Sequence, residues 1–364
     1  MYNGLDIVML RRILALHAAL YRAPRALPWA VAAFEESLSP DRLDIVLNAS
    51  AARGAAPDWA AADQALEWLA APGRGVLMIG RAGYPPLLRA IAAPPVLLFV
   101  DGDSSALASP QIAVVGSRQA TPRGRDIALE FARDLAVAGV TVTSGLARGI
   151  DGAAHRGALA GGGHTVAVLG CAIDRVYPSA HRALAEEIRG AGALVSEFPF
   201  GTTPLPAHFP RRNRIVSGLA LGTLVVEAAL RSGSLSTALH ALEQGREVFA
   251  VPGSIHNPLS QGCHALIKQG AKLVESIADI GEELPALQPL GGRTPRVGEA
   301  AEASRPSDAR ERRLLTACGW DAFTSEEVVQ RSGLTVQEVS SMLLKLELAG
   351  IIQVQGTGSY LRIR

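Results

Sequence analysis

From Gln111 onward, short apolar runs rich in β-branched residues alternate with longer stretches whose apolar residues recur at helical spacing. This alternation is typical of strand–helix–strand units, and it predicts a parallel sheet with helices on both faces. The chain therefore belongs to the α/β class. The expected strands cover residues 112–115, 140–143, 165–169, 193–196, 223–226, 248–251 and 272–274.

The regions on either side of this pattern predict further parts. Residues 1–72 show helical spacing cut by prolines, which predicts a small N-terminal helical domain of the sterile-alpha-motif type. Two apolar runs at 76–79 and 96–100 predict flanking strands, so the sheet domain spans residues 73–284. A stretch rich in Pro, Gly, Ala and charge at 285–306 reads as a linker.

Residues 307–364 carry the pattern of a winged-helix domain. A helix near 307–318 is followed by a capping box at Thr324 and Glu327, a turn at 332–334 and a helix at 335–349. Two short strands, 351–355 and 359–363, complete the outline. The last helix carries only Lys345 as a cation against Glu338 and Glu347, which favours a protein-contact or auxiliary role over DNA recognition.

Composition excludes several classes of protein. A chain of 364 residues is longer than a single hydrophobic core usually supports, so we expect more than one domain. A net charge of +1 excludes a polycation. The three cysteines, Cys171, Cys263 and Cys318, have no paired spacing, which predicts a reducing compartment and no zinc site. Arg11 and Arg12 interrupt the N-terminal apolar stretch, so we expect no signal peptide or membrane span and a cytoplasmic location.

Ligands of an open parallel sheet bind at the carboxyl ends of its strands, so the loops there are the candidate sites. After the first strand comes Gly116-Ser117-Arg118, which lacks the glycine spacing of a dinucleotide site. After the second comes the loop from Ser144 to Asp151, with Asp151 as the expected helix cap. No Gly-Lys-Ser/Thr phosphate loop occurs in the sequence. Small residues and amides at these turns predict an anion site.

A cluster of three arginines, Arg211, Arg212 and Arg214, follows Phe209 where a helix is expected to begin. Cations in the first turn of a helix are unfavourable, so they need an anion nearby. Two alternatives remain open at this point: the arginines bind a phosphate, or they pair with carboxylates of the same domain such as Glu197.

The sequence offers little for catalysis or for metal binding. Glu227 at a strand end is either a general base or an organiser of backbone amides. His256, Cys263 and His264 lack further metal ligands nearby, and no nucleophile elbow occurs. We therefore expect no catalytic residue, no metal and no cofactor.

Four segments, in order and spacing, closely resemble the signatures of the DNA processing protein A (DprA/Smf) family. They are residues 114–118 (Val-Val-Gly-Ser-Arg), 143–151, 209–219 (from Phe-Pro-Arg-Arg-Asn-Arg) and 245–253. The resemblance extends over about residues 84–280 and implies a Rossmann-like domain. It also implies a homodimer that binds single-stranded DNA during natural transformation and helps load the RecA recombinase.

The resemblance implies which residues bind single-stranded DNA. Arg118 would contact phosphate, Gly116 and Ser117 would form the anion-binding turn, and the arginine cluster would line the same groove. A lysine often follows Tyr-Pro in this family, but here Ser179, Ala180, His181 and Arg182 follow, so Arg182 or Arg175 is the substitute. The predicted phosphate-binding residues are Gly116, Ser117, Arg118, Ser144, Gly145, Arg148, Arg182, Arg211, Arg212, Asn213 and Arg214.

Two rival functions remain open. Rossmann-like nucleotide hydrolases of the LOG type place glycine-rich turns and a glutamate at such strand ends, although their Pro-Gly-Gly-x-Gly-Thr-x-x-Glu signature is absent here. A transcriptional regulator would use the winged helix for sequence-specific duplex binding.

Overall fold

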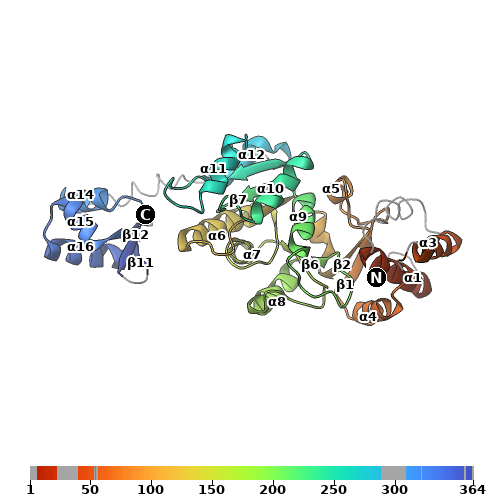
Figure 1. Cartoon of the computed structure of the whole chain (residues 1–364). Helices are drawn as coiled ribbons and strands as arrows, with labels where there is room; N and C mark the ends of the chain where they lie inside the picture. The colour runs from red at the N-terminus through yellow and green to blue at the C-terminus, as the bar shows by residue number, and fades with distance from the viewer. Residues whose placement is uncertain are drawn as a thin grey trace. The chain divides into compact units, whose positions relative to one another are not determined.

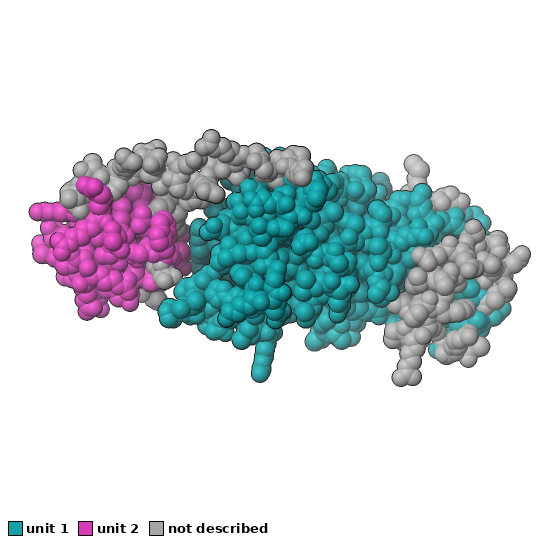
Figure 2. Space-filling model, turned by 90° about the horizontal axis from the view of Figure 1, so that it is seen from above, with its two compact units in different colours: residues 1–291 teal, residues 292–364 magenta. Residues whose placement is uncertain are grey.

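The computed structural model describes residues 6–22, 40–52, 54, 56–287, 309–320, 322–355 and 358–362. The chain divides into two compact units, Met1–Gly291 and Gly292–Arg364 (Figures 1 and 2). The first unit holds the large sheet and the N-terminal helices, and the second holds the winged helix.

A nine-stranded sheet with the order β1-β2-β6-β5-β4-β3-β7-β8-β9 forms the centre of the first unit. The seven strands from β3 onward are parallel, while β1 and β2 pair antiparallel at one edge. The chain runs outward from β3 in one direction and from β7 in the other, so their junction is the switch point where such folds bind ligands. The strands are β1 (Arg74–Met78), β2 (Leu97–Gly102), β3 (Gln111–Val115), β4 (Thr141–Ser144), β5 (Thr165–Val168), β6 (Ala193–Ser196), β7 (Gly222–Val225), β8 (Glu247–Ala250) and β9 (Lys272–Leu273).

Helices cover both faces of the sheet, and the alternation of strand side chains shows why. In β3, Ile112 and Val114 join one hydrophobic core with α6, α7 and α12, while Ala113 and Val115 join the other with α9, α10 and α11. The helices are α5 (Pro86–Arg89), α6 (Pro122–Val137), α7 (Ile150–Ala160), α8 (Arg182–Ala191), α9 (His208–Leu219), α10 (Ser234–Glu243), α11 (Gln261–Lys268) and α12 (Ile277–Glu283), with short 3₁₀ turns η2 (Ser104–Leu107) and η3 (Ser179–His181).

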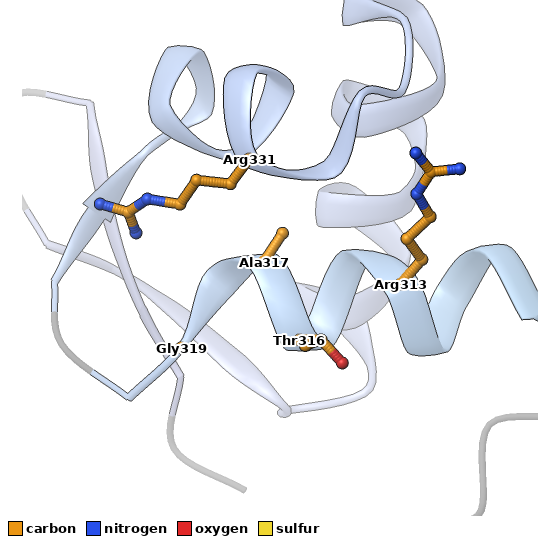
Figure 3. Close-up of a pocket in the computed structure, with 5 residues that line it drawn as sticks. All are labelled: Arg313, Thr316, Ala317, Gly319 and Arg331. Carbon is orange, nitrogen blue, oxygen red and sulfur yellow. The ribbon is translucent and has the colours of Figure 1, made fainter.

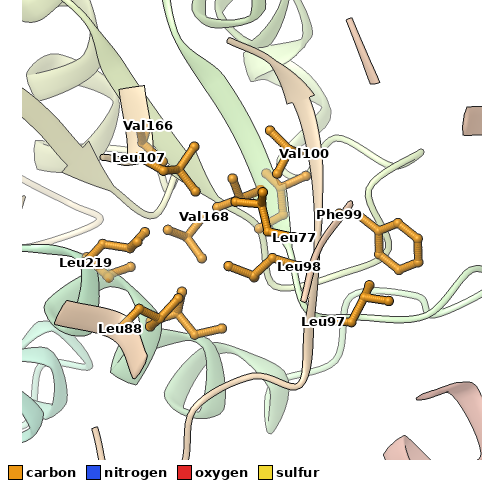
Figure 4. Close-up of a cluster of buried hydrophobic side chains, with 14 of the residues drawn as sticks. Leu77, Leu88, Leu97, Leu98, Phe99, Val100, Leu107, Val166, Val168 and Leu219 are labelled. Carbon is orange, nitrogen blue, oxygen red and sulfur yellow. The ribbon is translucent and has the colours of Figure 1, made fainter. Parts of the chain in front are cut away.

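The N-terminal helices α1 (Ile7–Arg22), α3 (Pro40–Ala52) and α4 (Trp59–Leu69) pack beside β1 and β2. Their apolar side chains belong to the same buried cluster as the flanking strands and β5. Figure 4 shows Leu77 of β1 and Leu98 of β2 beside Val168 of β5. The flanking strands thus join the helical region to the parallel sheet through one continuous core.

The second unit has the predicted winged-helix elements: α14 (Ala309–Cys318), α15 (Ser325–Ser332), α16 (Val336–Leu348), β11 (Ile352–Gln355) and β12 (Ser359–Arg362). The predicted capping box at Thr324 and Glu327 opens α15, and Gly333 ends it with a φ of 62°. A two-residue strand, β10 (Phe323–Thr324), pairs with β12 and was not predicted, because two residues give no alternation to read.

The predicted fold class is confirmed: a mostly parallel Rossmann-like sheet, N-terminal helices and a C-terminal winged helix. Each strand of the large sheet begins and ends within about two residues of its expected bounds. The boundary at residue 72 stays a prediction, and most of the expected linker, residues 288–306, lies outside the described residues. No helix in the described ranges is long and apolar enough to cross a membrane.

Candidate nucleic-acid interface

The turn after β3 is held tightly by neighbouring backbone. A Cβ atom on Gly116 would lie 2.6 Å from Ile150 Cγ1 and 2.8 Å from the Glu227 carbonyl oxygen, so no larger residue fits. The Ser117 N–H donates to that same carbonyl at 2.7 Å, and the Ser117 carbonyl accepts from Ile150. Gly116 and Ser117 are therefore both buried, and Ser117 is hydrogen-bonded to the protein itself, while Arg118 is exposed at the end of the turn.

A carboxylate from another loop lies at the N-terminus of the helix that follows this turn. Thr121 caps α6 as predicted and accepts from Gly124 N–H. The carboxylate of Glu227, from the loop after β7, accepts from Thr121 N–H at 2.9 Å and from the Thr121 hydroxyl at 2.6 Å. Glu227 is therefore an organiser of backbone amides, the second of the two roles considered for it, and it occupies the helix end that a phosphate would use.

The loop after β4 is also held by a carboxylate that accepts hydrogen bonds from backbone amides. Asp151 was expected to cap α7, but that helix begins at Ile150 after Gly149, and Asp151 lies inside its first turn. Its carboxylate accepts from Gly145 and Ala147 N–H groups at 3.1 and 3.3 Å. Ser144 is buried and donates to the Val114 carbonyl. A Cβ on Gly149 would lie 2.2 Å from the Ser117 carbonyl oxygen, so the two loops touch.

The arginine cluster in α9 starts later in its helix than the sequence suggested. The helix begins at His208, so Arg212 and Arg214 lie in its second turn rather than its first. Arg212 is only 3% exposed and donates to the carbonyls of Gly145 and Val168. It therefore joins the ends of β4 and β5 from within and has no exposed donor face for an external phosphate. Burial lowers the pKa of Arg212 to about 10, a shift that the nearby Asp151 opposes.

Arg211 and Arg214 both lie against Glu197, at the carboxyl end of β6. Arg214 Nη2 donates to Glu197 Oε1 at 2.5 Å, and Arg211 Nε lies 3.5 Å from Oε2. Of the two alternatives left open, the pairing with a carboxylate of the same domain is the one in the structure. Asn213 also turns inward, donating to the Gly233 carbonyl and the Ser236 hydroxyl.

Three predicted residues remain exposed at the carboxyl edge of the sheet: Arg118, Arg148 and Arg182. Their loops are in contact, since Gly149 packs on the turn at Ser117 and the His181 ring bonds to the Leu146 carbonyl at 2.9 Å. Among the described residues, no carboxylate lies within ion-pair distance of these three guanidinium groups. The loops after β3, β4 and β5 thus present a cationic rim, which we define by Arg118, Arg148 and Arg182.

An aromatic contribution to this rim was missed from the sequence. The Arg118 guanidinium lies over the Phe209 ring, 4.8 Å from its centroid, and the Tyr177 ring lies 5.7 Å from Phe209. Three segments supply these side chains: the β3 loop, the β5 loop and α9. No local pattern links three single residues spread so widely, although each stands next to a motif that was singled out.

The described residues contain no group of three or more His, Cys, Asp or Glu side chains placed to hold a metal ion. All three cysteines are buried, and burial raises their thiol pKa values to about 11 for Cys171 and Cys318 and about 12 for Cys263. Such thiols stay protonated near neutral pH and are poor nucleophiles.

Most cations among the described residues of the second unit lie outside its last helix, which carries only Lys345. Arg313 and Arg331 line a hollow of about 500 Å³ together with Thr316, Ala317 and Gly319, and their guanidinium groups point apart (Figure 3). Helix α16 instead exposes Val336, Leu344 and Leu348. The helix that a winged helix usually presents to DNA therefore exposes a mixture of apolar and polar side chains here, with Lys345 as its one cation among the described residues of α16.

Together, the fold and the rim define a class: a Rossmann-like protein with a cationic edge on its sheet, followed along the chain by a winged helix. A family model described as DNA recombination-mediator protein A matches residues 75–285, and the DprA winged helix domain matches residues 298–356. The chain belongs to this DprA/Smf family, and the resemblance seen in its motifs is confirmed.

Individual relatives agree with this assignment. Protein Smf of Escherichia coli is 46% identical over 303 residues, covering 83% of this chain and 81% of that protein. DNA processing protein DprA of Streptococcus pneumoniae is 47% identical over 197 residues, covering 54% and 70%. The X-ray structure of the S. pneumoniae protein matches with a TM-score of 0.59 and 36% identity over 78% of this chain and 94% of that one. A Helicobacter pylori DprA, described for its single-stranded DNA binding mode, matches with a TM-score of 0.52 and 29% identity over 57% and 93%.

Proposed function

We propose that this protein binds single-stranded DNA by its backbone phosphates at the cationic rim. The observation that carries the proposal is that Arg118, Arg148 and Arg182 stand exposed on three touching loops, without carboxylate partners among the described residues. Neighbouring arginines on one edge repel each other and are stabilised by a chain of anions. The H. pylori relative, described for single-stranded DNA binding, supports the same ligand.

The other predicted residues take supporting roles in this proposal. Gly116 and Ser117 hold the loop after β3 against Ile150 and Glu227, Ser144 donates to the Val114 carbonyl, and Gly145 leaves room for the Arg212 guanidinium. Arg212 and Asn213 brace α9 from within. Arg211 and Arg214 are partly neutralised by Glu197, so their attraction for phosphate is weaker than that of the rim. We therefore expect the rim residues to dominate the binding.

Arg118→Ala tests phosphate binding at the rim. Loss of the guanidinium removes one charge-assisted contact, so the affinity for an oligothymidine strand should fall about tenfold or more. The slope of log affinity against log salt should also become shallower, because fewer counterions are released. Fluorescence anisotropy at several salt concentrations measures both quantities.

Arg133→Ala is the matched control, because Arg133 is an exposed arginine on α6 that pairs with its neighbour Asp134. It should bind as the wild type does. An affinity that is unaffected by salt in the wild type, or unchanged by Arg118→Ala, would contradict phosphate binding at the rim.

In this function the protein binds its ligand without catalysing a reaction. The carboxylates at the loop ends, Glu227 and Asp151, are engaged with backbone amides, and the thiols are buried. Incubation with nucleoside monophosphates tests the rival hydrolase of the LOG type, because that enzyme would release free base.

The family supports the finer parts of the proposal: loading of the RecA recombinase during natural transformation, and a homodimer through the Rossmann-like domain. Helix α10 exposes Leu239 and Leu242, three residues apart on one face, as a self-association surface requires. Light scattering of the purified protein and a RecA filament-assembly assay on coated single strands test these two points.

A further inference from the structure

The hollow beside α14 and α15 in the second unit has the charge of an anion-binding site. Arg313 of α14 and Arg331 of α15 line it, and both residues are exposed. Among the described residues, neither guanidinium group forms an ion pair, whereas Arg310 of the same α14 pairs with Glu338 at 3.2 Å. Cations that line one hollow repel each other, and an anion in the hollow stabilises both of them. The hollow therefore favours a negatively charged occupant.

The directions of the two guanidinium groups indicate an extended occupant rather than a single ion. Figure 3 shows them pointing apart, with Ala317 between them. A Cβ atom on Gly333 would lie 3.0 Å from Arg313 Nη2, so the Arg313 guanidinium lies at the C-terminal end of α15. A single small anion reaches only one of the two arginines. An occupant that contacts both must carry its negative groups at intervals along a chain.

The end of α14 at the hollow favours a peptide over a nucleic acid. Thr316 and Ala317 belong to the last turn of this helix, and Gly319 follows its final residue. The last carbonyl groups of a helix have no partner within the helix and carry a partial negative charge. A peptide backbone donates N–H groups to such carbonyls, whereas a phosphate backbone has no donor to offer them. Strong nucleic-acid binding also needs many phosphate contacts, and this hollow provides only Arg313 and Arg331 as cations among the described residues.

An exposed tryptophan next to the hollow adds an apolar contact. Trp320 directly follows Gly319 and is 63% exposed. The Arg362 guanidinium lies over the Trp320 ring, 4.2 Å from its centroid. Tryptophan and arginine are among the side chains that most often dominate the binding energy of protein–protein interfaces. This side of the winged helix thus combines cations, carbonyl acceptors and an aromatic ring.

We propose that the hollow binds an acidic segment of a partner protein, with carboxylates on Arg313 and Arg331 and an apolar side chain on Trp320. All of these residues belong to the second unit, so the proposal is independent of the single-stranded DNA proposed for the rim. It places the protein-contact role expected for the winged helix on α14 and α15 rather than on α16.

The test uses the full chain and a labelled peptide of alternating aspartate and leucine, with binding measured by fluorescence anisotropy. The wild type should bind this peptide, and added salt should weaken the binding because its main contacts are ionic. The double variant Arg313→Gln and Arg331→Gln should lower the affinity about tenfold or more, since two charge-assisted contacts are lost. Trp320→Ala should lower it by a smaller factor. The affinity of the double variant for oligothymidine should equal that of the wild type.

Arg312→Gln is the matched control, because Arg312 is exposed on α14 next to Arg313 and does not line the hollow. It should keep the wild-type affinity for the peptide. Arg118→Ala should keep it as well, which distinguishes binding at the hollow from binding at the rim. Both replaced arginines are exposed, so the double variant should melt at the wild-type temperature.

Three results would overturn the proposal. The wild type does not bind the peptide, or the double variant binds it as tightly as the wild type does. In the third, the double variant keeps its peptide affinity and loses affinity for oligothymidine or duplex DNA, which would make the hollow a nucleic-acid site instead.

Discussion

One hydroxyl group determines which ring nitrogen of His155, on α7, carries the proton. The Thr165 hydroxyl donates its hydrogen to the Val142 carbonyl at 2.7 Å, so its oxygen accepts from His155 Nδ1 at 2.7 Å. The proton of the neutral ring is thus on Nδ1, and the buried Nε2 atom has no hydrogen-bond partner. A second proton would create an unsatisfied buried N–H, and burial lowers the pKa of His155 to about 3.

This histidine should make the stability of the fold depend on pH. The unfolded chain binds a proton at His155 below about pH 6.5, whereas the folded chain does not until about pH 3. Stability is therefore complete above pH 6.5 and falls as the pH drops through that window, by about 2 kcal/mol between pH 6.5 and 5. In His155→Gln this loss should be smaller by that amount, as measured by urea denaturation at several pH values.

His17 is also fully buried with a pKa lowered to about 4, so part of the acid sensitivity remains in the variant. The control is His256→Gln in the exposed loop after β8, which should keep the wild-type dependence. A His155→Gln protein whose stability falls with acid as steeply as the wild type would contradict the assignment.

At the scale of the elements, the sheet was predictable and its internal partners were not. Strands such as β3 are buried on both faces, so residues 112–115 appear in the sequence as an uninterrupted apolar run. The carboxylate that closes the start of α6 comes from Glu227, 106 residues after Thr121, and no local spacing indicates such a pairing. The burial of Arg212 could not be predicted either, because the sequence does not distinguish it from the neighbouring Arg211 and Arg214.

Glu227→Gln tests the role of this carboxylate at the start of α6. The change keeps the shape but removes the negative charge beside the helix N-terminus, and it turns an amide group toward Thr121 N–H. The free energy of unfolding should fall by about 1–3 kcal/mol, as measured by urea denaturation at pH 7. Glu247→Gln, at the exposed start of β8, is the matched control and should change it by less than about 0.5 kcal/mol. An equal effect of both changes would mean that Glu227 does not stabilise the helix.

At the scale of the whole molecule, the two units differ in where they can meet nucleic acid. The first unit carries the cationic rim, while the last helix of the second exposes Val336, Leu344 and Leu348 and carries Lys345 as its one cation among the described residues of α16. Affinity for nucleic acid depends mainly on cations placed against phosphates. The winged helix should therefore add little to single-strand binding.

A chain ending before Asp308 should retain its affinity for single-stranded DNA within about threefold of the full chain, because no contact at the rim is lost. A threefold change in affinity corresponds to less than about 1 kcal/mol of binding free energy. Anisotropy titrations with single-stranded and duplex oligonucleotides measure this. Arg118→Ala in the shortened chain should weaken binding by the same factor as in the full chain, because the rim lies entirely within the first unit. If the shortened chain loses most of its affinity for either form of DNA, the winged helix is a DNA-binding element. Its contacts with DNA would then come from surfaces other than α16, such as Arg313 and Arg331 at the hollow beside α14.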